Sequence, residues 1–393
     1  GWQLPSGLSG FLEGRLGARL QNDPGYDRTT LAEIRLRTEY ARSFAGLRGR
    51  LSFDLIAGKP DEEAVDLRTG EGWFDLREAW LLARPGRSVD LKAGRMIATW
   101  GTGDLIFIND LFPKDWISFL LGRDEDYLKA PFDGVRGTFF SDLANLDLVL
   151  GIPFAPDRFV DGSDLSFANP SGPPRLPSPD YPDRPDLYSR LFRTIGSTEA
   201  AAYFYDGFWK SPGGFSTTGR PLFPRLRVYG ASLRGAVFGG VSSVETGYYD
   251  SLDDRSGDNP LIKNSEWRFL VGHDREVLPK LNLGVQYYVE WLQDYHTYES
   301  TLPPEIEPRE EWRQLLTLRL TRLLLRDDLT LSFFAFYSPS DEDFYLRPYA
   351  SWKFSDRWRL SGGFNLFGGE TETTFFGQFE DNSNAYVALR AVW

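Results

Sequence analysis

The feature that most constrains the fold of this chain is an alternation of apolar and polar residues with a period of two. From 281 to 291 the odd positions hold Leu, Leu, Val, Tyr, Val and Trp, while the even positions hold Asn, Gly, Gln, Tyr and Glu. Successive side chains of a β-strand point to opposite faces, so this stretch predicts a strand with one apolar and one polar face. An amphipathic helix would need a period of 3.6 residues, which the stretch lacks.

The same pattern recurs in about eighteen segments, which predicts a chain built almost entirely of such strands. The segments are 11–20, 30–40, 47–57, 73–83, 89–98, 134–141, 146–152, 188–194, 198–207, 225–233, 237–248, 266–274, 281–291, 313–322, 329–338, 344–354, 358–367 and 384–393. The last one ends on an aromatic residue, Trp393, with no polar tail after it. A strand that ends at an aromatic girdle is typical of a transmembrane β-barrel.

The connections between these segments alternate strictly between short and long. The short ones lie near Ser43, Pro85, Leu143, Gly196, Gly235, Pro279, Arg326 and Asp356. The long ones are 21–29, 59–72, 101–132, 153–187, 208–224, 249–265, 292–311, 339–343 and 368–383. Short periplasmic turns and long extracellular loops characterise outer-membrane barrels, and an even number of strands brings both chain ends to the periplasmic side. We therefore predict an all-β fold, a single transmembrane antiparallel β-barrel of about 18 strands over residues 1–393.

Composition favours the barrel over a soluble all-β protein or a helical membrane protein. Aromatic residues make up 15% of the 393 residues, yet mean hydropathy is only -0.37. No run approaches the roughly 20 apolar residues of a membrane helix. A soluble sandwich would have to hide many apolar strand faces. The chain opens on Gly1 without a basic or apolar leader, so we expect that a signal peptide has been removed.

The residue inventory excludes several classes of site. There is no Cys, so disulfides, thiol nucleophiles, Cys-ligated metals and c-type haem attachment are excluded. A net charge of -12 argues against a nucleic-acid partner. The acidic residues Asp250, Asp253, Asp254 and Asp258 fit a solvated loop better than a Ca²⁺ site. We expect no cofactor and no metal.

The faces predicted to point into the barrel are polar and rich in arginine. Our candidate lumen residues are Arg15, Arg19, Arg35, Arg37, Arg48, Arg50, Arg77, Glu78, Arg95, Arg136, Arg225, Arg227 and Arg347. Arginine stays charged and binds carboxylates in a forked geometry, so the set predicts an anion-attracting path. The alternative is a structural lattice in which arginines and glutamates of neighbouring strands pair across the wall. The two interpretations are compatible, and we expect structural pairing to account for most of the set.

Two long loops differ in character. Loop 101–132 is apolar and aromatic, so we expect it to fold into the barrel mouth as a constriction or as a cap that shields the rim. Within it, Pro113–Leu121 predicts a short helix. Our candidate constriction residues are Asp104, Phe107, Asp110, Phe112, Trp116 and Phe119. Loop 153–187 is rich in Pro, Asp and Ser, which predicts an extended extracellular lid or a mobile loop.

Residues 74–110 carry a local motif. The chain reads FDLREAW at 74–80 and KAGRMIATWG at 92–101, followed by Asp104 and Asn109-Asp110. This resembles the LREA…GRQ…WG hairpin of proteobacterial outer-membrane barrels, a group of porin-like and, more distantly, alginate-export-like proteins. Met96 stands where the motif has Gln. The resemblance implies an eighteen-stranded barrel with an arginine-rich lumen, and a buried ionic cluster of Arg77, Glu78 and Arg95 beneath loop 101–132.

The resemblance also bears on partners. The terminal strand looks like the C-terminal signal of outer-membrane barrels, which implies that the barrel-assembly machinery recognises the strand ending at Trp393. A Gram-negative outer membrane further implies the lipid bilayer and lipopolysaccharide as surroundings.

An enzymatic role finds little support. The chain has two His residues. His273 falls on the lipid-facing side of its strand, where a lipase would need a partner hydroxyl on the same face. His296, in Asp294-Tyr295-His296, resembles half of an omptin protease site, with Asp124/Asp126 or Asp341/Asp343 as the acidic half. We expect that the protein is not an enzyme, and a hydrolase at the rim is a minor alternative.

We therefore expect an outer-membrane channel of the porin or exporter type, which carries out ion transport and passes small polar or anionic solutes through an arginine-rich lumen. The alternative is a non-conducting scaffold barrel that sheaths a periplasmic or surface protein, such as an electron-transfer protein. Because the chain has no Cys, any c-type haem would belong to that partner.

Overall fold

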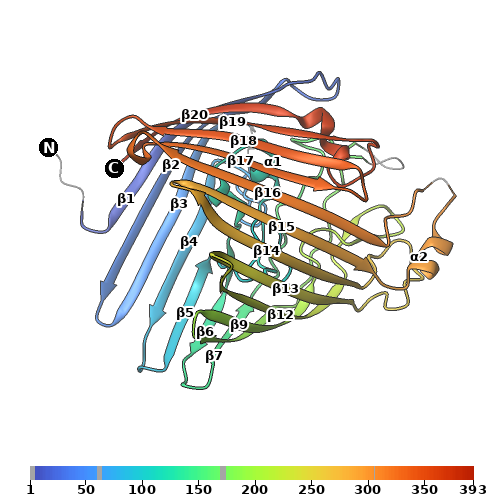
Figure 1. Cartoon of the computed structure of the whole chain (residues 1–393), viewed down its shortest axis with the longest axis horizontal. Coiled ribbons are helices and arrows are strands. Elements are labelled where there is room, and N and C mark those ends of the chain that lie inside the picture. Colours follow the sequence, from blue (N-terminus) through green and yellow to red (C-terminus); the bar gives the residue numbers. More distant parts are fainter. Residues whose placement is uncertain (1–4, 60–63, 169–173, 305) are drawn as a thin grey trace.

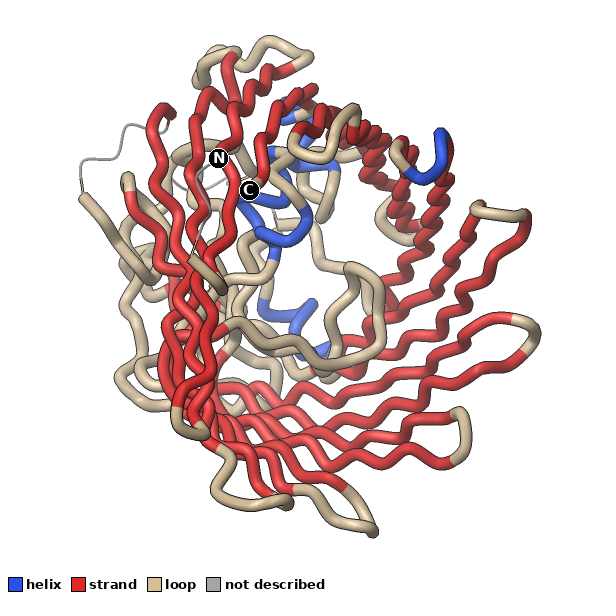
Figure 2. The backbone as a smooth tube through the Cα atoms, turned by 90° about the vertical axis from the view of Figure 1, so that its left-hand side faces the viewer, coloured by secondary structure: helices blue, strands red, loops and turns tan. Residues whose placement is uncertain are grey.

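In the computed structural model the chain forms one closed antiparallel β-barrel, and the structure describes residues 5–59, 64–168, 174–304 and 306–393. Eighteen strands make a single sheet in which neighbours in sequence pair in space, and the last strand pairs with the first. Figures 1 and 2 show the strands tilted around a central space that holds loops and short helices. The predicted fold class and strand number are confirmed.

The strands form where the period-two pattern predicts them, with ends that differ by a few residues. Their bounds are β1 Leu8–Arg19, β2 Thr29–Phe44, β3 Leu47–Lys59, β4 Phe74–Ala83, β5 Val89–Met96, β6 Phe132–Phe139, β7 Asn145–Gly151, β8 Asp186–Ile195, β9 Thr198–Phe208, β12 Arg225–Val237, β13 Gly240–Ser251, β14 Glu266–Leu278, β15 Leu281–Leu292, β16 Trp312–Leu324, β17 Leu329–Ser338, β18 Asp343–Lys353, β19 Trp358–Gly369 and β20 Asn384–Val392. Burial along β1 alternates between buried and exposed residues, as a wall with two different faces requires.

The two ends of the barrel differ, as the connection lengths predict. We call the end with the short connections the turn end and the other the loop end; β1 begins and β20 finishes at the turn end (Figure 1). The turn predicted near Gly235 lies instead at Phe238 and Gly239, because β12 and β13 remain paired as far as Val237 and Gly240. Both turn residues have positive φ, as a two-residue hairpin turn requires.

The loop end carries small elements that sequence patterns did not predict. They are the two-stranded sheet of β10 Gly214–Phe215 and β11 Pro221–Leu222, the helix α2 Tyr295–Thr301, and the 3₁₀ turn η3 Gly377–Asn382; a further 3₁₀ turn, η2 Leu325–Asp327, lies at the turn end. The connection from β5 to β6, residues 97–131, contains the helix α1 Trp116–Leu121 and the 3₁₀ turn η1 Glu125–Leu128. We call this connection the inner loop.

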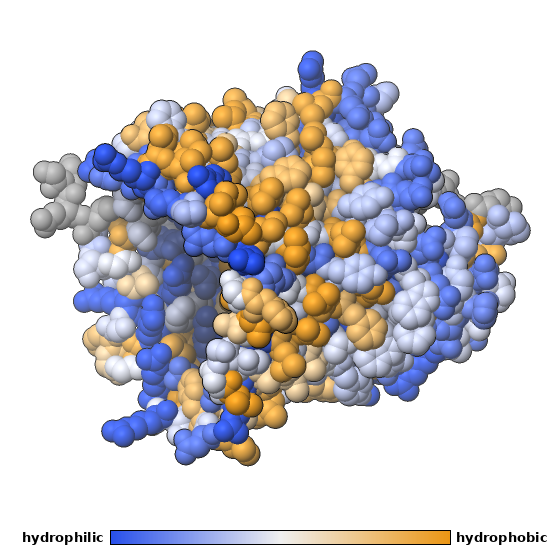
Figure 3. Space-filling view, in the orientation of Figure 1, coloured by the Kyte–Doolittle hydropathy of each residue, from blue (hydrophilic) through white to orange (hydrophobic). Residues whose placement is uncertain are grey.

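The outer surface of the barrel is apolar over its middle. Leu16, Ile34, Leu81 and other large aliphatic side chains point outward and are more than half exposed. Figure 3 shows hydrophobic residues gathered over the strands and hydrophilic ones toward both ends. No helix in the described ranges is long and apolar enough to cross a membrane.

Aromatic side chains flank this apolar band on the outer face. Toward the loop end, Trp291 of β15 stacks on Trp312 of β16 with ring centroids 4.6 Å apart. Toward the turn end, Trp352 and Trp358 occupy outward positions of β18 and β19 and are more than 40% exposed. An apolar band between two aromatic girdles on a closed, even-stranded barrel identifies an outer-membrane β-barrel, so the predicted location is confirmed.

Candidate functional site

The inner loop lies inside the barrel, and its helix is built by local capping. Asp115 caps α1, its carboxylate accepting hydrogen bonds from the backbone N–H and the hydroxyl of Ser118 at 2.8 Å each. Gly122, with φ at +85°, ends the helix and lies against the ring of Tyr386 on β20. The predicted helix Pro113–Leu121 was too long, because Asp115 caps the helix and its first residue is Trp116, three residues after the proline.

Glu245 of β13 holds the first part of the inner loop against the wall. Its buried carboxylate accepts hydrogen bonds from Thr102 N and Oγ1 at 2.7 and 2.9 Å and from Gly103 N at 3.2 Å. It also accepts from the backbone N and the side-chain Nδ2 of Asn109, both at 2.9 Å. A carboxylate without hydrogens can accept all five of these bonds, so one wall residue fixes both ends of residues 102–109.

Two glycines of the wall make room for the same segment. Gly230 of β12 and Gly247 of β13 face each other across the two strands. A Cβ atom on Gly230 would lie 1.7 Å from Asn109 Oδ1, and one on Gly247 would lie 2.8 Å from a methyl carbon of Ile108. Because glycine has no side chain, the two residues leave a notch in the wall, and Ile108 and Asn109 of the inner loop occupy it.

Tyr127, at the other end of the inner loop, is enclosed by three arginines of the wall. Its ring lies 4.5 Å from the guanidinium carbon of Arg35, 4.9 Å from that of Arg37 and 5.1 Å from that of Arg77. Arg37 also donates a hydrogen bond to the Tyr127 hydroxyl at 2.8 Å. Arg35 and Arg37 share the fully buried carboxylate of Asp54, so these arginines pair within the wall and hold the loop at once.

Loop residues 122–124 are tied to β1 and β20. Arg15 donates to the Gly122 carbonyl at 2.5 Å and to Glu13 at 3.0 Å. Arg390 of β20 bridges Glu13 at 2.7 Å and Asp124 at 3.0 Å. Both arginines are thus occupied by the loop and by their neighbour on the wall.

Two further arginines reach the loop from β16 and β18. Arg319 pairs with Asp104 at 2.6 Å and with Glu125 at 3.1 Å. Arg347 pairs with Glu125 at 3.3 Å, and its guanidinium carbon lies 3.9 Å from the ring centroid of Phe119. The inner loop is therefore bonded to β1, β2, β4, β13, β16, β18 and β20, and so crosses the barrel from wall to wall (Figure 2).

The first part of the next long connection, residues 152–168, packs against the inner loop instead of extending outward as the predicted lid. Arg158, nearly fully buried, pairs with Asp75 of β4 at 2.8 Å and with Asp115 at 3.2 Å. Asp157 accepts hydrogen bonds from Lys114 N and Trp116 Nε1. Composition did not reveal this packing, because the connection as a whole is rich in Pro, Asp and Ser although Phe154 and Leu165 are buried in it. Residues 169–173 of the predicted lid lie outside the described ranges.

The same connection also reaches β1 and the last long loop. Arg19 donates to the Asp164 carbonyl at 2.7 Å and to Asn382 Oδ1 at 3.4 Å. Asn382 exchanges hydrogen bonds with the backbone of Ser166. Arg19 is therefore fixed at the loop end, away from the centre of the lumen.

Toward the turn end, basic side chains line the inner wall in one register row. Arg48 of β3 and Lys92 of β5 flank Leu82 of β4, and Lys92 lies opposite Arg136 of β6. Arg136 pairs with Asp147 at 3.0 Å. In the described part of the chain no carboxylate forms an ion pair with Arg48 or Lys92. We call Arg48, Lys92 and Arg136 the basic row.

The predicted ionic cluster of Arg77, Glu78 and Arg95 does not form. A register shift in β4 turns Arg77 toward the inner loop, where it donates to the Lys129 carbonyl at 2.5 Å. Glu78 instead pairs with Arg50 at 2.7 Å. Arg95 pairs with Asp133 on the neighbouring strand at 2.8 Å and donates to the carbonyls of Leu67 and Leu76.

Arg225 and Arg227 were wrongly predicted to face the lumen. Their neighbours Leu226 and Val228 are fully buried and occupy the inner face of β12. The two arginines therefore lie on the outer register at the loop end, where Arg227 pairs with Asp206 at 2.7 Å. The prediction failed because this stretch of β12 has its apolar residues inside, against the inner loop, and its charged residues outside, above the membrane.

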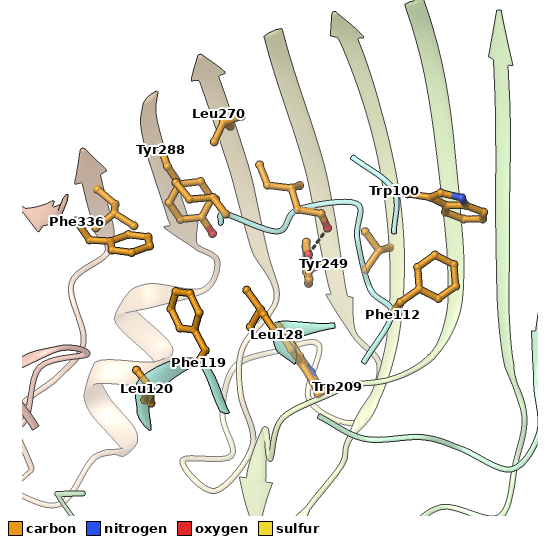
Figure 4. Close-up of a cluster of buried hydrophobic side chains, with 14 of the residues drawn as sticks. Trp100, Phe112, Phe119, Leu120, Leu128, Trp209, Tyr249, Leu270, Tyr288 and Phe336 are labelled. Atoms are coloured by element: carbon orange, nitrogen blue, oxygen red, sulfur yellow. Dashed lines mark hydrogen bonds between the residues drawn. The ribbon is translucent and has the colours of Figure 1, made fainter. Parts of the chain in front are cut away.

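The six predicted constriction residues have different surroundings. Phe112 is buried against the wall, its ring stacked on Tyr188 at 4.5 Å. Asp110 is buried too, and pairs with Lys114 at 3.0 Å. Phe107, Trp116 and Phe119 line a cavity to which Asp110 and Phe112 also contribute, and Asp104 is held by Arg319. Figure 4 shows Trp100, Phe112, Phe119 and their apolar neighbours between the inner loop and the strands.

That cavity lies on the loop-end side of α1 and has a volume of about 880 Å³. The inner loop forms one wall, and residues of β12 to β18 with the long connections at the loop end form the other. Aromatic rings and charged side chains both face the space. Its size is within the range of sites for small organic ligands.

His296 does not lie in the arrangement expected of an omptin-like site. His296 is on α2 at the loop end, and the centroid of its ring lies 6.3 Å from the ring centroid of Tyr295. Asp341 pairs with Arg313, and Asp343 accepts a hydrogen bond from Phe376 N, so both are engaged elsewhere.

His273 has the partner hydroxyl that a lipase would need. His273 Nδ1 lies 2.8 Å from Ser242 Oγ on the lipid-facing side. No acidic third member contacts His273 among the residues that the structure describes.

The acidic loop 249–258 holds its carboxylates in protein contacts. Asp250 pairs with Arg255 at 2.8 Å, and Asp254 accepts hydrogen bonds from the backbone of Asp258 and Asn259. Within the described ranges no group of three or more His, Asp or Glu residues is arranged to hold a metal.

No family model and no curated protein matches the chain. Solved structures with similar folds include the outer membrane channel DcaP of Acinetobacter baumannii, 12% identical with a TM-score of 0.46, covering 100% of this chain and 99% of that one. A triple mutant of the Rhodopseudomonas blastica porin is 11% identical with a TM-score of 0.43 over 98% and 99% of the chains. A loop-deletion mutant of the Vibrio cholerae outer membrane protein OmpT is 13% identical with a TM-score of 0.43 over 98% of both. The strand pairing of this chain itself establishes its barrel.

Proposed function

We propose that this barrel is an outer-membrane channel of the porin type, which passes small polar or anionic solutes past the inner loop. The observation that carries the proposal is the basic row. Most lumen arginines pair with carboxylates or with the inner loop, but Arg48 and Lys92 have no such partner and face the lumen. Unpaired cations along a low-dielectric wall attract anions and raise their local concentration.

The inner loop supports the same proposal as a constriction. It crosses the barrel between the loop-end cavity and the basic row, so a solute has to pass beside it. Buried ion pairs and hydrogen bonds fix it to the wall on several sides, which keeps the width of the passage constant. A fixed passage with a positive field favours small anions over cations.

Planar-bilayer recording tests the proposal. We expect steady single-channel currents and a reversal potential that indicates anion preference. The double variant Arg48→Gln and Lys92→Gln should reduce that preference. The matched control is Arg193→Gln with Arg275→Gln, which removes two exposed positive charges on outward-facing positions of β8 and β14. Equal reversal potentials for the wild type and the lumen variant would refute the role of the basic row.

The scaffold alternative makes the opposite prediction. If the barrel only sheathes a partner protein, no current will flow even after residues 101–132 are deleted. In a second form of the proposal the barrel is an exporter of an anionic polymer, because the motif at 74–110 distantly resembles alginate-export-like barrels. Measuring polymer flux through the wild-type barrel tests this form.

A further inference from the structure

We infer that the loop-end cavity binds an organic anion with an apolar body, such as an aromatic carboxylate. This inference rests on the proposed channel function and names the class of solute that the channel would select. Two features of the cavity carry it: a group of cations that keeps unused hydrogen-bond donors, and an aromatic wall beside that group.

Four cations face the cavity from β14, β16 and the loops before them. We call Lys263, Arg268, Arg309 and Arg313 the cation cluster. The members share Glu266 and Glu290 at distances from 2.5 to 3.8 Å, and Arg313 also pairs with Asp341 at 2.6 Å. Four positive charges thus share three carboxylates, each of which is held in at least one ion pair.

The hydrogen bonds within the cluster are incomplete as well. Arg313 Nη2 and Glu266 Oε2 are buried and have no hydrogen-bond partner. Arg309 is 43% exposed and contacts Glu266 and Glu290 only at 3.8 and 3.7 Å. A guanidinium group has five N–H donors, so Arg309 and Arg313 retain donors for a carboxylate that enters the cavity.

The aromatic wall adjoins the cation cluster directly. The guanidinium carbon of Arg313 lies 4.7 Å from the ring centroid of Phe375, and Lys263 Nζ lies 4.2 Å from that of Trp209. Phe336 and Phe376 continue the wall, with centroids 5.4 Å apart. Figure 4 shows Phe336 on its strand in the same region as Phe119 of α1 and Trp209.

The two features together define the ligand class. A small polar anion would satisfy the cations but leave the aromatic wall unfilled, and a neutral apolar molecule would bury the wall while leaving the cations unpaired. An aromatic or long-chain carboxylate satisfies both. The carboxylates of Glu307, Glu310, Glu342 and Glu370 also line the cavity, but they are exposed, so water screens their charge as it screens that of Arg309.

Direct binding to the detergent-solubilised barrel tests the inference without any ion current. Saturation-transfer NMR with benzoate, acetate and benzyl alcohol separates the contributions of charge and ring. We expect benzoate to bind at least tenfold more tightly than the other two. Equal affinity for benzoate and benzyl alcohol, or for benzoate and acetate, would overturn the inference.

Variants locate the site. Arg309→Gln and Arg313→Gln should each weaken benzoate binding severalfold, whereas Arg220→Gln, which removes an exposed arginine paired with Asp180, should not. Arg309 is a loop residue, so its variant stays informative if Arg313→Gln fails to fold. Unchanged binding by Arg309→Gln in a folded barrel would contradict the assignment. If the barrel conducts ions but does not bind benzoate, only this inference is refuted. If it binds benzoate but does not conduct ions, only the proposed channel function is refuted.

Discussion

Glu245 Oε2 of β13 lies 2.7 Å from the backbone nitrogen of Thr102, a residue 143 positions earlier in the chain. This contact is one of five hydrogen bonds to the same carboxylate, all from the inner loop. Each hydrogen bond to a charged acceptor contributes about 1.5–3 kcal/mol in favourable cases. The position of the loop therefore depends on one residue of the wall.

We predict that Glu245→Gln loosens the inner loop. The amide of Gln places N–H donors against the N–H donors of Thr102 and Asn109, so part of the hydrogen-bond set is lost. Single-channel recordings should show larger current fluctuations and a higher mean conductance. Glu39→Gln is the matched control, because Glu39 pairs with Arg37 and Arg50 of the wall. Identical current noise in both variants would show that Glu245 does not hold the loop.

We predict that Gly230→Val displaces the inner loop from its notch. The new side chain would occupy the position of Asn109 Oδ1, so residues 108–109 have to move away from the wall. Protease sensitivity of the loop should rise in the folded barrel. Gly14→Val on β1 is the control, since Gly14 has no atom within 4 Å of its Cβ position. Equal protection from cleavage in the two variants would argue against the notch.

Arg158 joins the connection between β7 and β8 to β4 and to the inner loop, and its loss should be costly. Arg158→Gln leaves Asp75 and Asp115 buried with incomplete partners, which lowers the free energy of unfolding by about 3–5 kcal/mol. Arg175→Gln removes an arginine that is 63% exposed and should cost at most about 1 kcal/mol. Urea titrations of both refolded variants measure the difference. Similar midpoints would mean that the buried pair adds little.

Glu125 neutralises part of the lumen charge, since it pairs with both Arg319 and Arg347. We predict that Glu125→Gln raises anion preference, with the permeability ratio increasing about twofold to fivefold as one negative charge leaves the passage. Reversal potentials in a salt gradient measure the ratio. Glu372→Gln, in an exposed stretch at the loop end, is the control for total charge. A fall in anion preference would show that ions do not pass near Glu125.

Lys263 gives the cation cluster a pH dependence. Burial, against the opposing effect of Glu266 and Glu290 and with a smaller contribution from Arg268 and Arg309, lowers the pKa of Lys263 to about 8. Because the free amine appears as the pH rises through about 8, the positive charge of Lys263 is present below that pH and is lost above it. Benzoate, ionised throughout, should bind more weakly at pH 9 than at pH 7. The Lys263→Met variant should bind benzoate equally well at pH 7 and pH 9. If that variant keeps the pH dependence of the wild type, another group is responsible for it.

The sequence predicted the wall far better than the interior. The period-two pattern within each strand is enough to predict that strand. Where a predicted strand end is wrong by a few residues, the predicted pairing with the neighbouring strands is still correct. Arg225 and Arg227 show where the pattern misleads. Leu226 and Val228 are buried by the inner loop and not by lipid, so the apolar face of that stretch points inward.

The inner loop was recognisable as a buried segment, but its contacts were not predictable. Its aromatic composition indicates burial, whereas the partners of Arg123, Glu125 and Tyr127 depend on which strands stand opposite them in the closed barrel. One signal was present in the sequence. A dense charged run at 123–126 inside an apolar loop indicates ion pairs with the wall, because isolated charges are costly to bury.

The attachment of the inner loop to opposite sides of the barrel has a mechanical consequence. An empty eighteen-stranded cylinder resists bending only through its own sheet, and lateral pressure from the bilayer tends to flatten it. Here Arg123 bonds Glu33 of β2 on one side and Asn109 bonds Glu245 of β13 on the other, with the packed loop between them. The loop thus braces the barrel across its width, and the cross-section of the barrel and the width of the space inside it depend on the same set of bonds.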